Sequence, residues 1–278
     1  MSKLKLIIKA TLGLPLFYFI NCGISYFIVL TLLSLTSGYT SNQLSSSPYF
    51  IGLQTNLSYI LGGILTLVMY KIICEPTNSE VIEMCKFNKI SFEKVIYVIL
   101  FFLSLSILII LLSGMVYTLS PNVFKSYEHI SKLLRYSSNT VFGVITTIII
   151  APIFEEIFCR GLILGYLRRE CKVIPALILQ AFAFAFMHGN LFQGFYTFIL
   201  GILLGLIVYY TNSIFSSMIG HMIFNILGSG VLSYLSNYSI LINTIVVLSI
   251  PFAIFAGIKL FRKSKQLVPQ KQIDTNRI

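Results

Sequence analysis

Residues 151–164 have the sequence APIFEEIFCRGLIL, which places Glu155, Glu156 and Arg160 inside an apolar run that extends over 141–167. A helix needs about 20 mostly apolar residues to cross the hydrocarbon core of a bilayer. This run is long enough, so we predict a transmembrane helix. An ionisable side chain at membrane depth costs at least about 2.5–3.5 kcal/mol on insertion scales. Three of them in one helix therefore indicate a specific role.

The rest of the chain has the composition of a membrane protein. Of its 278 residues, 56% are hydrophobic and 10% are charged, and the mean hydropathy is +0.88. An ordinary soluble domain is about 25% charged, so this composition excludes a soluble enzyme and a disordered chain. We expect an all-α, polytopic integral membrane protein with about eight transmembrane helices and a buried polar site among helices four, five and seven. The predicted spans are 10–35, 55–73, 95–117, 141–167, 174–189, 192–211, 214–235 and 239–261, with ends uncertain by about ±4 residues.

The basic residues predict the orientation of these spans. The net charge is +11. If both termini are cytoplasmic, 16 Lys and Arg residues lie in inner segments, three lie in outer segments, and Arg160 lies within a span. Cytoplasmic loops of membrane proteins carry such an excess. We therefore predict a multi-pass protein of the cell membrane with both termini in the cytoplasm and no nucleic-acid partner.

Three regions are expected along the chain. Residues 1–140 contain N-terminal transmembrane helices and loops, and their spans hold no acidic residue and no histidine. We expect these helices to face lipid or to serve in packing. Residues 141–235 form the expected catalytic core, and residues 236–278 form the last helix and a basic cytoplasmic tail. Between the fifth and sixth spans the apolar sequence is broken at 188–193, so a re-entrant segment there is the alternative to two separate spans.

Helical spacing separates the two glutamates of the fourth span. Glu156 and Arg160 are four residues apart and share a face, so they can neutralise one another. Glu155 points about 100° away and needs a partner on another helix. Pro152 removes a backbone hydrogen bond near Glu155 and favours a kink there.

Two of the three histidines also lie in predicted spans. His188 ends the run FAFAFMH at 182–188, and His221 lies in GHMIFN at 220–225 with Asn225 four residues later on the same face. At a rise of about 1.5 Å per residue, Glu155, His188, His221 and Asn225 share a slab about 10 Å thick. This common depth favours one polar site on three helices.

These residues resemble the motifs of the CPBP (Abi) family of intramembrane proteases. That family includes type II CAAX prenyl endopeptidases and bacteriocin-immunity proteins. Its motifs EExxxR, FxxxH and HxxxN/D match Glu155-Glu156-xxx-Arg160, Phe184-xxx-His188 and His221-xxx-Asn225, in order. The resemblance implies that Glu155 and His188 activate a water and that His221 and Asn225 stabilise the oxyanion. Glu156 and Arg160 would then support the site.

The expected chemistry is hydrolysis of a peptide bond in a membrane-associated protein or peptide. A metal is one route, because Glu155, His188 and His221 would supply three ligands and leave a fourth position open, as in catalytic zinc sites. A metal-free Glu/His mechanism uses the same residues, and the sequence does not separate the two. A nucleophilic Cys159 is disfavoured, because a thiol buried beside a carboxylate loses reactivity.

Two other classes of function stay open. Intramembrane Glu, Arg and His also build proton relays, so a proton-coupled transporter is one alternative, although no internal repeat supports it. A non-catalytic bacteriocin-immunity or regulatory membrane scaffold is the other.

Two pairs of glycines and one asparagine lie near the predicted site. The pairs Gly161/Gly165 and Gly201/Gly205 fit close helix packing, or their spacing is accidental. Asn190 is expected to cap a helix rather than to take part in the site.

Overall fold

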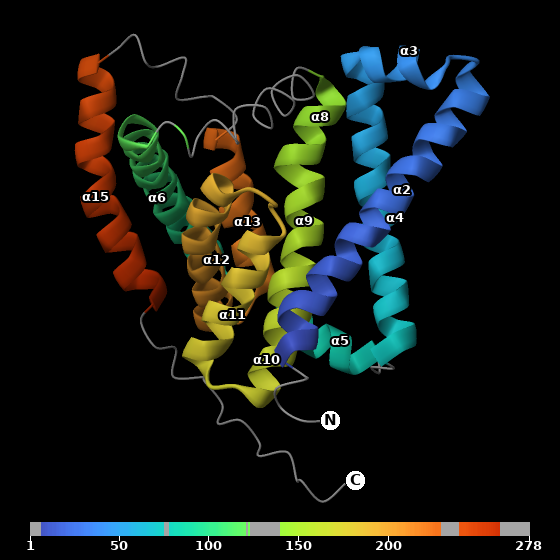
Figure 1. Cartoon of the computed structure of the whole chain (residues 1–278). Coiled ribbons are helices and arrows are strands. Elements are labelled where there is room, and N and C mark those ends of the chain that lie inside the picture. The colour runs from blue at the N-terminus through green and yellow to red at the C-terminus, as the bar shows by residue number, and fades with distance from the viewer. Residues whose placement is uncertain (1–6, 75–77, 121, 123–139, 229–238, 262–278) are drawn as a thin grey trace, which may run out of the picture.

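The computed structural model describes residues 7–74, 78–120, 122, 140–228 and 239–261. Every regular element in this part of the chain is a helix (Figure 1), which confirms the predicted all-α class. The chain is a polytopic membrane protein.

Five helical segments are long and apolar enough to cross a bilayer by length and composition. Four of the five fall on predicted spans one to four, and the fifth falls on span six. They are η1 with α2 (Lys9–Gly13 and Leu14–Ser37), α4 (Pro48–Cys74), α6 (Phe92–Leu119), the continuous helix Val141–Glu170, and α12 (Leu191–Thr211).

The remaining predicted spans also contain helices. These are α11 (Val173–Phe186), α13 (Ile214–Ile226) and α15 (Ser239–Phe261). The predicted span 214–235 runs partly outside the described residues, so its end is not tested. Two short helices, α3 (Ser41–Ser46) and α5 (Asn78–Cys85), connect longer ones.

The predicted fifth span, 174–189, is wrong at its C-terminal end. Helix α11 stops at Phe186, and His188 lies in the turn that follows. The turn is fixed locally: Gly189 takes φ +63°, which favours glycine, and the Asn190 side chain caps α12 by accepting from the N–H of Gln193. His188 is therefore held by a tight turn and not by a helix interior, and Asn190 is the helix cap that we expected.

The helix Val141–Glu170 is not a uniform α-helix. It consists of α8 (Val141–Ile145), η2 (Thr146–Ile150), α9 (Ala151–Glu156), η3 (Ile157–Ile163) and α10 (Leu164–Glu170), where η2 and η3 are π-helical. We call these five segments the core helix. Pro152 lies in the first turn of α9, directly after η2. Proline has no N–H to donate, and here it follows a π segment, where the α-helical hydrogen-bond pattern is already interrupted. Such π segments are frequent at functional sites.

The core helix runs between two groups of helices. On one side, α4 contacts α8, η2 and α9, and α2 pairs with α4. On the other side, α13 contacts η2, α9 and η3, while α6 pairs with α15 and α11 pairs with α12. Figure 1 shows the α2–α4 pair on one side of α9 and α6, α12, α13 and α15 on the other.

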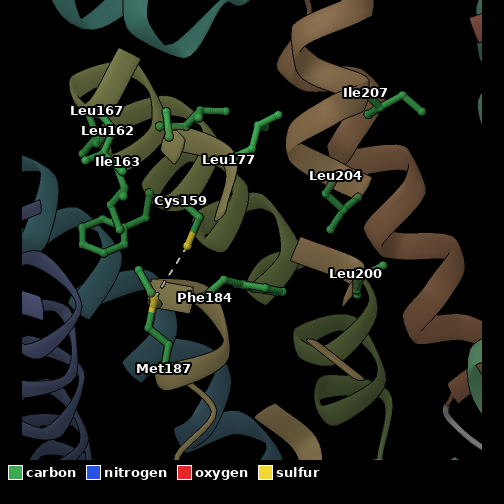
Figure 2. Close-up of a cluster of buried hydrophobic side chains, with 14 of the residues drawn as sticks. Cys159, Leu162, Ile163, Leu167, Leu177, Phe184, Met187, Leu200, Leu204 and Ile207 are labelled. Carbon is green, nitrogen blue, oxygen red and sulfur yellow. Dashed lines mark hydrogen bonds between the residues drawn. The ribbon is translucent and has the colours of Figure 1, made fainter. Parts of the chain in front are cut away.

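Apolar side chains of the core helix pack against the α11–α12 pair (Figure 2). Cys159 is fully buried in this cluster, and its Sγ lies 3.7 Å from Sδ of Met187. The labelled members come from the core helix, α11 with its following turn, and α12: Cys159, Leu162, Ile163, Leu167, Leu177, Phe184, Met187, Leu200, Leu204 and Ile207.

The two glycine pairs face close neighbours. A Cβ at Gly201 would lie 3.1 Å from Ala181, and one at Gly205 would lie 2.7 Å from Leu177, both on α11. Close packing therefore explains the pair on α12. The pair Gly161/Gly165 contacts the short helix α5 through Cys85 and Met84 instead of another span.

Charge is distributed unevenly between the two ends of the bundle. Among the described residues, every Lys and Arg except Arg160 lies at the end that carries α5 and α10, at the bottom of Figure 1. This is the end that the sequence predicts to be cytoplasmic.

Candidate active site

A buried ion pair lies at the middle of the core helix. Nη1 of Arg160 donates to Oε1 of Glu156 at 2.8 Å, and both side chains are almost completely buried. This confirms the predicted pairing of these two residues. The guanidinium also donates through Nη2 to the carbonyl of Gly201 at 3.3 Å and stands 4.3 Å from the centre of the Phe184 ring. Arg160 thus ties the core helix to both α11 and α12.

His221 of α13 joins both glutamates. Its Nδ1 lies 2.8 Å from Oε1 of Glu156, and its Nε2 lies 3.7 Å from Oε2 of Glu155. Because Glu156 is paired with Arg160, its carboxylate is an acceptor, so Nδ1 of His221 is the donor. The Nε2 atom then faces Glu155. The prediction that Glu155 needs a partner on another helix is confirmed, and the partner is His221.

His188 holds a different position from the one expected beside Glu155. Its Nδ1 lies 2.8 Å from the carbonyl oxygen of Phe184. Since a carbonyl only accepts, Nδ1 is the donor, and Nε2 of the neutral ring keeps a lone pair. Among the described residues, His221 and not His188 lies within ion-pair distance of Glu155.

Phe184 separates the two imidazoles. Its ring meets that of His188 edge to face with centroids 4.8 Å apart, and that of His221 at 5.5 Å. The FxxxH motif thereby supplies a spacer as well as a histidine. From the sequence, Phe184 was only the first residue of the FxxxH motif, and its position between the two rings was not predicted.

Asn225 binds the core helix through its amide. Its Nδ2 donates to the carbonyl oxygen of Thr147, in η2, at 2.8 Å. His221 and Asn225 therefore face the core helix together, as their spacing predicted. The second amide hydrogen of Asn225 is not used in this bond.

One supporting group, a buried glutamine, was not predicted from the sequence. Gln180 of α11 is fully buried and donates through Nε2 to the carbonyl oxygens of Gly201, at 2.8 Å, and Leu177, at 3.0 Å. It therefore shares the Gly201 carbonyl with Arg160. A glutamine inside an apolar run was the available signal, since a buried amide needs partners.

The N-terminal helices also reach the site. Tyr18 of α2 stacks on Phe158 of the core helix with ring centroids 5.1 Å apart, and Tyr18 and Tyr59 of α4 both lie within electrostatic range of Glu155. The Glu155 side chain is 14% exposed, more than that of Glu156. The expectation that these helices only face lipid or pack is too narrow, because α2 and α4 also line the surroundings of Glu155.

The donor set does not form a metal centre as placed. Among the described residues, no group of three or more His, Cys, Asp or Glu side chains is arranged to hold a metal ion. Nδ1 of His221 is bonded to Glu156, and Nδ1 of His188 is bonded to backbone. The three-ligand set of Glu155, His188 and His221 therefore stays a prediction.

The comparison with protein families matches the middle of the chain. Residues 137–227 match the family described as Type II CAAX prenyl endopeptidase Rce1-like. This match covers about a third of the chain and supports the resemblance of this segment to the CPBP family. The segment contains the paired glutamates, both intramembrane histidines and Asn225, and the family is one of CAAX-type intramembrane proteases. No curated protein and no solved structure matches the chain.

Proposed function

We propose that this protein is an intramembrane endopeptidase that hydrolyses a peptide bond of a membrane-associated protein or peptide with a Glu/His-activated water. The observation that carries the proposal is the chain of contacts Arg160–Glu156–His221–Glu155 inside the helical bundle. The match of residues 137–227, which include these side chains, to the Rce1-like endopeptidase family supports the reaction class.

Glu156 acts as a positioning residue in this proposal. Its charge is balanced by Arg160, and its Oε1 receives the Nδ1 proton of His221. A carboxylate bonded to one ring nitrogen fixes the tautomer and orientation of a histidine. The other nitrogen, Nε2, is thereby directed toward Glu155.

Glu155 is the proposed general base. It takes a proton from a water, the resulting hydroxide adds to the carbonyl carbon of the substrate, and a tetrahedral oxyanion forms. Glu155 then gives the proton to the departing amine as the carbon–nitrogen bond breaks. The lone pair on Nε2 of His188 serves as a second acceptor for the attacking water.

His221 and Asn225 are the proposed oxyanion stabilisers. Both project from one face of α13 toward the core helix. A protonated Nε2 of His221, whose ring is oriented by the bond from Nδ1 to Glu156, and the second amide hydrogen of Asn225 would donate to the oxygen that develops negative charge. Preorganised donors of this kind contribute about 2.7–4 kcal/mol each.

Cleavage by purified protein in liposomes tests the proposal. The substrates are prenylated CAAX peptides and a membrane protein fraction, whose new N-termini are identified by mass spectrometry. We expect Glu155→Gln, His188→Ala and His221→Ala each to lower cleavage about 10²–10⁴-fold. Glu170→Gln, at the exposed end of α10, is the matched control and keeps wild-type rates.

The proposal fails if folded wild-type protein and Glu155→Gln produce the same set of new termini. The activity of a rigorously metal-free sample distinguishes a metal-free mechanism from a metal-dependent one. Full activity in that sample supports the metal-free mechanism, whereas loss that zinc restores supports the three-ligand alternative.

A further inference from the structure

A cavity of about 770 Å³ opens at the basic end of the bundle. Its walls come from the end of α5 and the segment after it, the start of α6, the end of the core helix in η3 and α10, the start of α11 and the end of α12. Glu155, His188 and His221 are not among its lining residues, but Arg160 is. The cavity is thus separate from the glutamate–histidine cluster and meets it at one side chain.

The lining of the cavity is rich in cations. Arg160 is paired with Glu156, and Arg169 is paired with Glu80 at 3.6 Å. One carboxylate, Glu83, also lines the cavity. Four further basic residues outnumber it: Lys86, Lys89, Lys94 and Arg168.

The fold fixes the backbone around Lys86. Lys86 and Asn212 both have positive φ, at 51° and 55°, in two loops that bind each other. The N–H of Ile214 donates to the carbonyl of Lys86 at 3.1 Å, and Nδ2 of Asn88 donates to that of Asn212 at 2.8 Å. Oγ of Ser213 donates to the carbonyl of Asn88 at 2.6 Å. These bonds hold the loop that carries Lys86 against the loop that carries Asn212.

Two of the cations are close to each other. Burial and the neighbouring Arg168 guanidinium lower the pKa of Lys86 below its usual range. The Arg168 guanidinium also lies 5.4 Å from the centre of the Tyr209 ring. Lys86, Lys89 and Lys94 line the same cavity, so the lining as a whole favours an anionic ligand.

We propose that this cavity binds a phosphate group, carried either by an anionic phospholipid or by a soluble phosphate. Arginine and lysine clusters pair well with phosphate oxygens through charge-assisted hydrogen bonds. Basic pockets between transmembrane helices on the cytoplasmic side bind anionic head groups. The volume is within the range of small-ligand sites, about 300–1,000 Å³.

Lipid retention by the purified full chain tests the site. Protein is reconstituted in nanodiscs of phosphatidylcholine with phosphatidylglycerol, and bound lipids are counted by native mass spectrometry. The wild type is expected to retain phosphatidylglycerol at least about tenfold better than phosphatidylcholine. A cation near the membrane surface contributes about fivefold, so Lys86→Gln with Arg168→Gln should weaken retention about thirtyfold. Lys71→Gln, at the same end but outside the cavity, is the matched control.

A second arm distinguishes the sources of the phosphate. Thermal unfolding in a neutral detergent is followed with short-chain phosphatidylglycerol, with short-chain phosphatidylcholine, or with sodium phosphate at constant ionic strength. Stabilisation by phosphatidylglycerol alone assigns the site to lipid, and equal stabilisation by sodium phosphate assigns it to a soluble phosphate. If neither stabilises the wild type beyond phosphatidylcholine, the proposal is wrong. If the double variant does not fold, Lys89→Gln with Lys94→Gln replaces it, and unchanged retention in that variant also overturns the proposal.

Discussion

Arg160 is a buried cation whose neighbours come from three helices. Glu156 of α9 balances its charge, Gly201 of α12 accepts one of its hydrogens, and Phe184 of α11 lies beside its guanidinium. A buried charge is tolerated only when such partners are present. The pair therefore determines how three helices meet, in addition to any part in chemistry.

Removing one partner of this pair is expected to be costly. Glu156→Gln should lower the free energy of unfolding by about 3–5 kcal/mol, because it leaves the buried Arg160 uncompensated. Replacing both residues, Glu156→Gln with Arg160→Met, should destabilise less than the single change. Unfolding by denaturing detergent in mixed micelles measures both. If the single and the double variant each lose less than about 1 kcal/mol of unfolding free energy, the expectation is contradicted.

Asn225 offers a way to separate structure from catalysis. Asn225→Ala removes one bond to Thr147, so the free energy of unfolding should fall by about 1 kcal/mol. If its amide also supports the oxyanion, kcat should fall about 10²–10³-fold. Asn21→Ala is the control, because Asn21 also makes one buried bond, to Thr66 at 3.2 Å, between α2 and α4. The control should lose similar stability and keep its activity, and equal losses of activity in both variants would argue against the role of Asn225.

Single-residue geometry was only partly predictable from sequence. The Glu156–Arg160 pair follows from four-residue spacing within one helix, and that spacing needs no knowledge of other helices. The position of His221 between two glutamates depends on how α13 packs on the core helix. Since no local pattern encodes that packing, the resemblance grouped Glu155 with His188, and the contact between Glu155 and His221 was not predicted.

At the scale of elements, α5 depends on glycines of the core helix. A Cβ at Gly161 would lie 2.6 Å from Sγ of Cys85, and one at Gly165 would lie 2.8 Å from Cβ of Met84. Both distances are shorter than ordinary van der Waals contact. Helix α5 therefore docks where the core helix presents only backbone.

Gly165→Val is expected to displace α5. Burial raises the pKa of the Cys85 thiol to about 11, so at neutral pH it stays protonated and reacts slowly with maleimide. Displacement should increase the labelling rate of Cys85 at least about tenfold, with partly exposed Cys171 as the internal reference in mass spectra. Gly23→Val, where nothing lies near the added Cβ, is the control. An unchanged Cys85 rate would show that α5 tolerates the added side chain.

Helix positions were more predictable than helix types and ends. Long apolar runs identified a helix in each of the eight stretches, because a bilayer demands about 20 apolar residues per crossing. The π segments η2 and η3 were not predicted. Their side chains are mostly apolar, and such residues occur in α-helices and π-helices alike, so the sequence does not distinguish the two. The early end of α11 was missed because Met187 and His188 continue the apolar run while Gly189 turns the chain.

For the whole molecule, the basic end is expected to face the cytoplasm. Asn42→Cys, in α3, and Lys71→Cys, in the last turn of α4, report on opposite ends. In intact cells, a membrane-impermeant maleimide should label Asn42→Cys, whereas Lys71→Cys should be labelled only after lysis. Labelling of the chain without either substitution measures the background from its native cysteines. The opposite pattern would invert the predicted orientation.

The short length of α11 has a consequence for the lipid around it. Its outward side carries an apolar stripe of Ile174, Ile178, Phe182 and Phe186. Fourteen residues rise only about 21 Å, against a hydrocarbon thickness of about 30 Å. Lipids that contact this stripe must compress or let their head groups dip inward. Such a thin patch would shorten the path of water from the membrane surface to the turn that carries His188.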